Sequence, residues 1–211
     1  MNRLLPLLLA VTLFSGCGDP KEASKPNFEK AINAYFQTAP ECIDVFVRDK
    51  LPVTVQVSGY STSKVERYDR FVKVGLLKAT DGEAESAGLF SKERVKTRQY
   101  ELTDEGKRYY FEDASNPVLV FAVGASRGFC FGKRSVAEIK NFSEPSNLDG
   151  LTVSQVNFTY RISDVAKWSE DSDIRAAFPE MAKKLTTPAV DGKATLVKTG
   201  DGWVHESMFK R

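Results

Sequence analysis

Residues 153–162 read Val-Ser-Gln-Val-Asn-Phe-Thr-Tyr-Arg-Ile, and their alternation is the clearest structural signal in the chain. In an extended strand the apolar side chains of Val156, Phe158, Tyr160 and Ile162 fall on one face, and the polar ones fall on the other. Alternation of this length predicts an antiparallel strand with one face on a core and the other in water. We therefore expect this stretch to form part of a β-sheet.

Segments on both sides of this strand extend the prediction to a small antiparallel sheet with one helix. Residues 135–142 are typical of a further strand, and residues 118–123 form a short apolar run typical of a buried strand. Residues 199–202 (Thr-Gly-Asp-Gly) predict a hairpin turn near the C-terminus. Residues 172–185 carry apolar side chains at helical spacing, and Pro179 among them predicts a kink or two short helices.

The first half of the chain predicts helices and strands in another order. Apolar side chains over residues 28–36 recur at helical spacing. Residues 63–66 (Ser-Lys-Val-Glu) are a capping box that opens a second helix, which Gly75 can end. A polar stretch over residues 78–88 follows, and residues 92–102 are typical of a strand.

This order ends in residues 100–107 (Tyr-Glu-Leu-Thr-Asp-Glu-Gly-Lys), with Thr103 as the expected cap of a short helix. The segment resembles the end of the wing, and the entry into the next helix, in winged-helix domains. The resemblance implies an α+β fold: a winged-helix-like half over residues 28–113, followed by a small antiparallel β-sheet half with one helix over residues 114–211. A fold of this kind hosts many functions, so the resemblance specifies none.

The N-terminus predicts where the protein resides. One positive charge, an apolar run over residues 4–14 and small residues after the run are typical of a secretory signal peptide. The run is too short to span a bilayer as a helix. Residues 14–17 (Phe-Ser-Gly-Cys) resemble the lipobox of bacterial lipoproteins, with Phe14 in place of the usual Leu. The resemblance implies removal of residues 1–16 and acylation of Cys17.

An acylated Cys17 would make the membrane a partner of this protein through its lipid anchor. Residues 17–27 are polar and contain two prolines, which predicts a flexible tether after the lipidated cysteine. The residue directly after Cys17 is Gly18, whereas an Asp at this position would resemble an inner-membrane retention signal. We therefore expect the protein in the outer membrane, facing the periplasm, with the inner membrane as the alternative.

The mature chain also resembles a group of proteobacterial lipoproteins of this size to which no activity is attached. Members carry an F-C-x-G-K segment, which stands here at residues 129–133. A second segment of the pattern Y-x-Y/F-R-I/V-x-D-x-x-x-W ends here at Trp168, with Phe158 at its first position. The resemblance adds no mechanism.

The remaining cysteines, Cys42 and Cys130, predict a disulfide. Disulfides persist in an oxidising compartment, and the alternative is two separate buried thiols. One histidine and three cysteines exclude most zinc frameworks built from protein ligands. We expect neither a metal nor another cofactor.

Residues that could support catalysis are sparse. His205, the single histidine, lies on the C-terminal hairpin, and no Gly-x-Ser-x-Gly elbow supplies a serine nucleophile. Glu170, Asp171 and Asp173 stand near a helix start, where acids complement the helix dipole. We predict a non-enzymatic protein. The alternative is a small-ligand binder or hydrolase of the cell envelope that uses aromatic and carboxylate groups near Trp168.

The signal peptide and the balanced net charge favour an envelope partner over nucleic acid. The 211 residues include 30 basic and 28 acidic side chains, a net charge of +2, which argues against a nucleic-acid binder. Lys92, Arg94, Lys96 and Arg98 alternate along one predicted strand and share a face. This face has two interpretations: a solvated surface, or a contact for an envelope protein or an anionic envelope component. The sequence thus predicts a lipid-anchored envelope protein with an interaction or accessory role.

Overall fold

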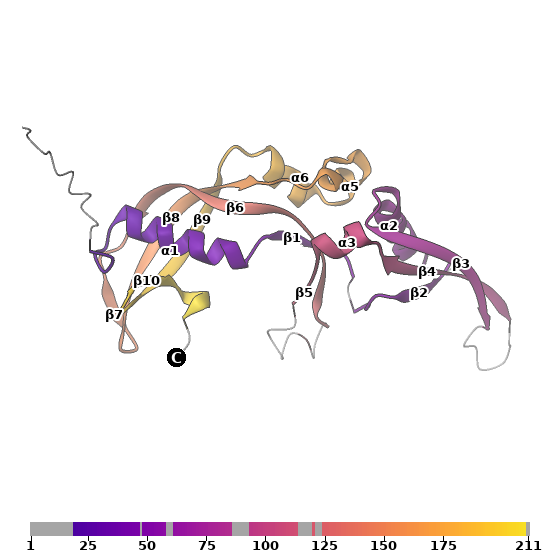
Figure 1. The fold of residues 1–211 in the computed structure, drawn as a ribbon, viewed down its shortest axis with the longest axis horizontal. Coiled ribbons are helices and arrows are strands. Elements are labelled where there is room, and N and C mark those ends of the chain that lie inside the picture. Colours follow the sequence, from indigo (N-terminus) through magenta and orange to yellow (C-terminus); the bar gives the residue numbers. More distant parts are fainter. Residues whose placement is uncertain are drawn as a thin grey trace, which may run out of the picture.

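Two antiparallel sheets follow one another along the long axis of the molecule (Figure 1). One has seven strands in the order β1-β6-β8-β9-β10, with β5 paired to β6 and β7 paired to β8; the other has three strands in the order β2-β4-β3. The computed structural model of the chain describes residues 19–46, 48–57, 61–85, 93–113, 120 and 124–209. Among these residues no helix has the length and apolar character needed to cross a membrane.

The seven-stranded sheet and the helix that covers it are called the body. The helix is α1 (Lys25–Thr38). The strands are β1 (Glu41–Asp44), β5 (Tyr110–Asp113), β6 (Ser126–Phe142), β7 (Ser146–Leu148), β8 (Leu151–Ser163), β9 (Val190–Thr199) and β10 (Gly202–His205). A short 3-10 helix, η3 (Glu206–Met208), follows β10.

The core of the body forms because α1 and β8 are both amphipathic. Phe28 and Ile32 of α1 are fully buried, and they face the alternating apolar side of β8 that includes Val156 and Phe158. Each large apolar side chain buried in this way contributes about 1.5 to 3 kcal/mol. The predicted strand over residues 153–162 is therefore confirmed as part of β8.

The sheet of the body curls because its two longest strands are bulged. The pairing of β6 with β8 shifts register between Val136 and Glu138, and again between Ile139 and Asn141. An extra residue on one strand bends that strand and increases the local right-handed twist. Figure 1 shows the resulting arch of β6 over the length of the body.

The three-stranded sheet and its two helices are called the arm. Its elements are β2 (Val53–Gln56), α2 (Thr62–Lys73), β3 (Leu77–Glu85), β4 (Arg94–Leu102) and α3 (Asp104–Tyr109). Tyr68 and Phe71 of α2 are buried against Tyr100 of β4. Gly75, at φ 78°, turns the chain from α2 into β3, a backbone conformation that glycine adopts without steric cost.

A helical segment between β8 and β9 packs on the arm rather than on α1. It consists of the 3-10 helix η2 (Lys167–Glu170) and the helices α5 (Ser172–Ala177) and α6 (Pro179–Thr186). Trp168, Ile174 and Met181 of this segment are buried in the same core as Phe71 of the arm. The break before Pro179 confirms the prediction of two short helices.

The arm is an insertion between two neighbouring strands of the body, and a disulfide closes its base. The chain leaves the body after β1 and returns through β5 to β6, which pairs with β1. Cys42 of β1 and Cys130 of β6 are register partners and form a disulfide across 88 residues of sequence. The predicted disulfide is therefore confirmed, and it encloses the whole arm.

The predicted fold class, an α+β protein with a winged-helix-like half and a small antiparallel sheet half, is wrong. The described chain is mostly β, and its main feature is a large curled sheet of seven strands. The expected first helix of the winged-helix half, α1, covers the body instead of the arm. The stretch expected as a polar excursion, residues 78–88, continues as strand β3 up to Glu85.

Several individual elements stand where the sequence predicts them despite this correction. The helix expected before Gly75 is α2, but the capping box at residues 63–66 does not form, because α2 begins at Thr62 and Ser61, at its N-cap, makes no side-chain cap hydrogen bond. The strand over residues 92–102 is β4 from Arg94 onward, and Thr103 caps α3. The C-terminal hairpin is formed by β9 and β10. The strand expected over residues 118–123 lies outside the described residues, apart from Val120.

Candidate functional site

A pocket of about 410 Å³ lies where the arm meets the helical segment. Small-molecule sites in proteins fall in this size range and often lie between two packed units. We call it the Trp168 pocket. The arm contributes Val74, Leu76, Glu105 and Tyr109, and the helical segment contributes Lys167, Trp168, Glu170 and Asp171.

Hydrogen bonds fix the helical side of the pocket to the body. The backbone N–H of Ala166 donates to the carbonyl oxygen of Phe131 in β6 at 2.9 Å, which ties the start of η2 to the sheet. The buried Ser169 hydroxyl donates to the carbonyl oxygen of Ala166 at 2.7 Å. The Trp168 ring packs edge-on against Phe71 and Phe129, with centroid distances of 6.1 Å. The indole is therefore held by both the arm and the body.

The arm side of the pocket depends on a close contact between α3 and the turn before β3. The Thr103 hydroxyl accepts the N–H of Gly106 at 2.9 Å and donates to the carbonyl oxygen of Gly75 at 2.7 Å. A Cβ atom at Gly106 would lie 2.0 Å from the carbonyl oxygen of Leu76, so only glycine allows this approach. The contact sets Tyr109 beside Trp168, at a centroid distance of 6.4 Å.

An ion pair joins the two sides of the pocket. Lys73 of α2 reaches Asp173 at 2.6 Å and Asp171 at 3.4 Å. Asp171 also caps α5, because its carboxylate accepts the N–H groups of Ile174 and Asp173. These backbone donors, chiefly that of Ile174, together with Lys73 hold the pKa of Asp171 below its ordinary value. Asp171 is therefore an ionised structural residue of the rim.

Other polar groups of the pocket have no partner in the described part of the chain. Lys167 and Glu170 form no ion pair there, and the Tyr109 hydroxyl has no hydrogen-bond partner. The indole N–H of Trp168 is buried without an acceptor. A buried donor left unpaired costs about 1 to 3 kcal/mol, so this group calls for an explanation. The pocket thus combines an apolar and aromatic wall with two charged lining residues, Lys167 and Glu170, that have no ion-pair partner among the described residues.

The basic strand face predicted from the sequence is balanced by acids. The register of β3 places an acid directly opposite each described cation of β4: Asp81 opposite Arg98, Glu83 opposite Lys96, and Glu85 opposite Arg94. Arg98 donates to Asp81 at 2.6 Å and to Asp69 at 2.8 Å. Arg94 lies 3.4 Å from Glu83. Lys92 lies outside the described residues. The structure therefore does not gather these cations into a free basic surface.

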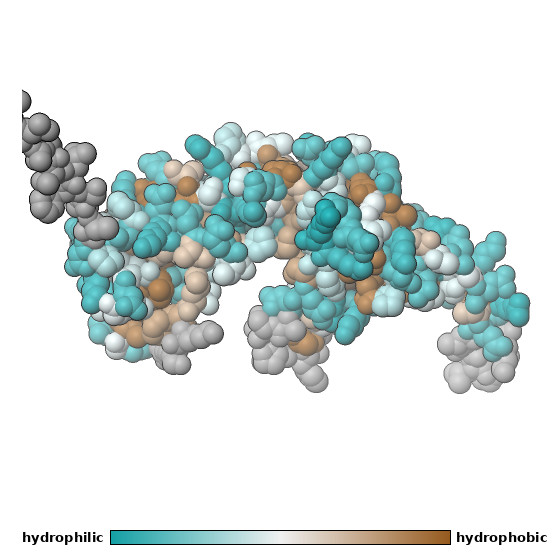
Figure 2. All heavy atoms as spheres, viewed as in Figure 1, coloured by the Kyte–Doolittle hydropathy of each residue, from teal (hydrophilic) through white to brown (hydrophobic). Residues whose placement is uncertain are grey.

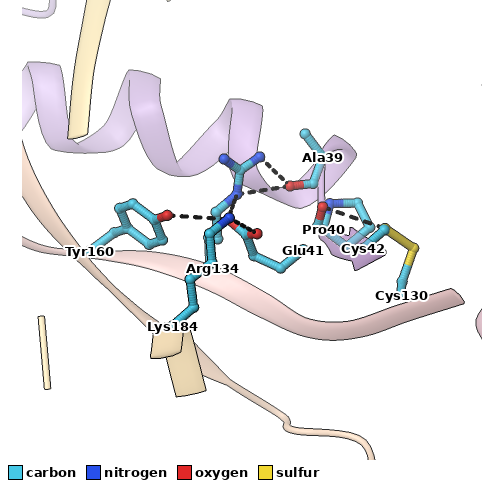
Figure 3. Close-up of polar contacts among 8 residues, drawn as sticks. All are labelled: Ala39, Pro40, Glu41, Cys42, Cys130, Arg134, Tyr160 and Lys184. Carbon is cyan, nitrogen blue, oxygen red and sulfur yellow. Dashed lines mark hydrogen bonds and ion pairs between the residues drawn. A yellow bond between two sulfur atoms is a disulfide. The ribbon is translucent and has the colours of Figure 1, made fainter. Parts of the chain in front are cut away.

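A second polar cluster lies beside the disulfide and is fully paired (Figure 3). The carboxylate of Glu41, which is 7 % exposed, lies 2.7 Å from the Lys184 ammonium and 3.7 Å from the Arg134 guanidinium. The Tyr160 hydroxyl donates to it at 3.2 Å. Burial and the neighbouring Glu41 raise the pKa of Tyr160 to about 12. Since every charge here has a partner, the cluster fastens α6 to strands β1, β6 and β8 and has a structural role.

His205 occupies a structural position. Its ring stacks on Tyr35 of α1 at a centroid distance of 3.8 Å, and its Nδ1 atom accepts the N–H of Ser207. Burial, with a smaller contribution from Arg134, lowers the pKa of His205 below its ordinary value. A neutral, stacked histidine with one nitrogen occupied is poorly placed to act as a general base.

The sequence identified only part of this site. The alternative expectation was a ligand site built from aromatic and carboxylate groups near Trp168, and Trp168, Glu170 and Asp171 line the pocket. Val74, Leu76 and Glu105 were missed, because Val74 and Leu76 look like ordinary core residues. Cys17 lies outside the described residues. In the described part of the chain no three metal-ligating side chains are placed to share an ion.

Comparisons with known proteins give no external guide to this site. No family model matches the chain, and the searches of curated proteins and of solved structures find no match either.

Proposed function

We propose that this chain is a lipid-anchored protein of the bacterial envelope that binds a small organic ligand in the Trp168 pocket. The observation that carries the binding role is the pocket itself, with Trp168 and Tyr109 on its wall and with Lys167 and Glu170, which form no ion pair among the described residues, in its lining. The anchor rests on the sequence before Gly18, which combines a signal peptide with a lipobox ending at Cys17. We place the anchor in the outer membrane with the folded chain in the periplasm.

The pocket favours a ligand with an apolar or aromatic body and few charges. Glu105 is paired with Arg108 at 3.1 Å, and Asp171 is paired with Lys73. The remaining rim charges, Lys167 and Glu170, have opposite signs. A rim with this balance gives no net attraction to either sign of ligand charge, so aromatic and apolar contact supplies the affinity.

We propose binding rather than catalysis at this site. None of the described residues that line the pocket is a serine, cysteine or histidine, so no common nucleophile or imidazole base is present among them. Asp171 is committed as the cap of α5. A hydrolase would have to depend on Glu105, Glu170, Lys167 or Tyr109, and no described contact pairs any of these as nucleophile and base. An interaction through the basic strand face is less favoured, because acids of β3 balance the described cations.

Phenol is a suitable first probe, because it has an aromatic body and one hydroxyl group. We expect saturable NMR shift changes at the Trp168 indole N–H and at the amides of residues 105–109 and 167–171 in the mature chain. The variant Val74→Phe fills the pocket and should abolish these changes. Val165→Phe, at an exposed position outside the lining, should leave them intact. Shift changes that are absent, or that persist unchanged in Val74→Phe, would refute the binding role.

The anchor is tested separately by the intact mass of the protein extracted from membranes. We expect a chain that begins at Cys17, carries the mass of acyl chains and loses none of this mass on reduction. An unprocessed chain in the soluble fraction would overturn the proposed anchor without affecting the pocket.

A further inference from the structure

The first described residues, 19–24, are fastened to one end of the body, although the sequence predicts a flexible tether over residues 17–27. The indole N–H of Trp203 in β10 donates to the carbonyl oxygens of Lys21 and Glu22, at 3.3 and 3.1 Å. The side-chain amide of Asn27 donates to the carbonyl oxygens of Asp19 and Glu22, at 2.8 and 3.0 Å. Helix α1 then begins at Lys25. The chain is therefore held to the body from Asp19 onward.

This docking fixes the distance between the proposed anchor and the body. Cys17 precedes Asp19 by two residues, which span at most about 7 Å even when fully extended. A flexible linker of ten residues would allow a mean reach of roughly 17 Å. Acyl chains on Cys17 would therefore hold the end of the body that contacts Asp19 at the bilayer surface, with little freedom to turn away.

Two hairpin turns, β7–β8 and β9–β10, lie at the same end of the body as the docked residues 19–24. A Cβ atom at Gly202, the first residue of β10, would lie 2.9 Å from the carbonyl oxygen of Pro20, so the β9–β10 turn adjoins the docked segment. Val153 of β8 pairs with Val197 of β9, which places the β7–β8 turn at the same end of the sheet as the β9–β10 turn. The two turns and the docked segment thus form one surface, which we call the anchor end.

The anchor end exposes a large apolar side chain, and contact of such a side chain with water is unfavourable. Leu148, on the β7–β8 turn, is 57 % exposed, the largest exposed fraction among the large hydrophobic residues of the described chain. Leu151, the register partner of Leu148, is half-buried. Asp149 and Gly150 connect the two strands, and their positive φ angles of 52° and 81° are those that a tight two-residue hairpin turn requires. Figure 2 shows further apolar atoms over the β7 and β10 end of the body, whereas hydrophilic atoms cover most of the arm.

We propose that the anchor end is a membrane-contact surface, with Leu148 at the lipid interface and the arm directed away from the bilayer. This proposal rests on the proposed acylation of Cys17. Figure 1 shows the arm at the opposite end of the long axis from the start of α1, where the docked residues 19–24 lie. The Trp168 pocket, between arm and body, is thereby held off the membrane and opens to the periplasmic space. The partner of this surface is a phospholipid bilayer.

The test compares two variants of the full, acylated chain, each with one added free cysteine that is labelled with a nitrobenzoxadiazole dye while the Cys42–Cys130 disulfide stays oxidised. Leu148→Cys places the dye at the anchor end, and Ala84→Cys places it on the exposed strand β3 of the arm. On vesicles of phosphatidylethanolamine and phosphatidylglycerol, we expect a blue shift and quenching by spin-labelled headgroups for the dye at residue 148. The dye at residue 84 should remain as in water.

An inserted linker tests whether the short connection is the cause. About ten Gly and Ser residues added after Gly18 should leave acylation intact and sharply reduce the quenching at residue 148. Equal quenching at both positions, stronger quenching at residue 84, or quenching that the linker leaves unchanged would overturn the proposal. A blue shift that depends on protein concentration and needs no vesicles would identify a second copy of the chain as the partner and would also overturn it.

Failure of the anchor is distinguished from failure of this orientation by mass. If the intact mass lacks acyl chains, the proposed anchor fails. If the acyl mass is present and the two dyes behave alike, the anchor stands and the membrane-contact surface is wrong.

Discussion

Strands β8 of the body and β3 of the arm are held in place by different forces. In β8 every second side chain over much of the strand is buried, including Val156 and Phe158. In β3 only Leu77 is buried, and all the following residues are exposed. The body is therefore stabilised by burial of apolar surface, whereas the outer edge of the arm depends on backbone pairing and on acid–base pairs with β4. Four predictions test this contrast.

The largest effect is expected where the arm joins the body. Replacing both Cys42 and Cys130 with serine opens a loop of 88 residues. We expect a loss of about 4 to 5 kcal/mol in the free energy of unfolding, because the open chain gains conformational entropy when it unfolds. Urea unfolding of the double variant and of the disulfide-bonded chain measures this loss. Equal unfolding free energies would contradict a stabilising effect of the disulfide through the unfolded chain.

Burial in the body should have the next largest effect. Phe28→Ala removes a fully buried ring that contacts Phe142 and Trp203 edge-on, at centroid distances of 4.8 and 4.9 Å. We expect a loss of about 3 to 5 kcal/mol. Thr80→Ala, on the exposed part of β3, should change stability by less than about 0.5 kcal/mol. Similar losses for the two variants, measured by urea unfolding, would contradict the contrast between body and arm.

The burial of His205 predicts a dependence of stability on pH. The folded pKa of His205 lies below the ordinary value because of burial, so the unfolded chain binds more protons between the two pKa values. Stability should therefore fall as the pH decreases through about 6.5, by less than about 1.4 kcal/mol per pH unit. His205→Gln should show a smaller loss between pH 7.5 and 5.5, in unfolding experiments at both pH values. Equal losses in both proteins would show that His205 is not the cause.

The smallest effect is expected for the acid–base pairs of the arm. Asp81→Asn weakens the contact with Arg98, and both side chains reach solvent. We expect a small decrease in the unfolding midpoint at low ionic strength that disappears in 1 M salt, because salt screens exposed charges. Thermal unfolding at the two salt concentrations measures the difference. A decrease that is insensitive to salt would indicate that packing, rather than charge, holds β3.

The same contrast explains which parts of the fold could be predicted from the sequence. The strand β8 and the helix α2 have buried faces, so their apolar residues recur at a readable period. The strand β3 is exposed on both faces, so no alternation marks it, and residues 78–88 looked like a polar excursion. The pairing of the strands could not be predicted from the sequence either, because β1 has only four residues and its partner β6 begins more than eighty residues later in the chain.

The candidate site was only partly predictable for a related reason. Trp168 and Tyr109 are large aromatic residues, and such residues can be recognised in a sequence as candidates for a ligand site. Val74 and Leu76, on the arm side of the pocket, lie about ninety residues before Trp168 and look like ordinary core positions. Gly106 belongs to the segment over residues 100–107 that resembles winged-helix domains. Its role here is a close backbone contact with Leu76, and a contact between residues thirty positions apart is seen only in the folded structure.

The disulfide at the base of the arm also determines what happens when a protease cuts the chain. A single cut of the backbone between Cys42 and Cys130 leaves two fragments that the disulfide still joins. The N-terminal fragment holds α1 and β1, and the C-terminal fragment holds β6 to β10, so the core of the body remains assembled around the break. A nicked chain would therefore migrate as one species on a non-reducing gel and as two after reduction. Shedding of such a protein from an N-terminal anchor would require a cut before Cys42, in a stretch that from Asp19 onward is fastened to the body.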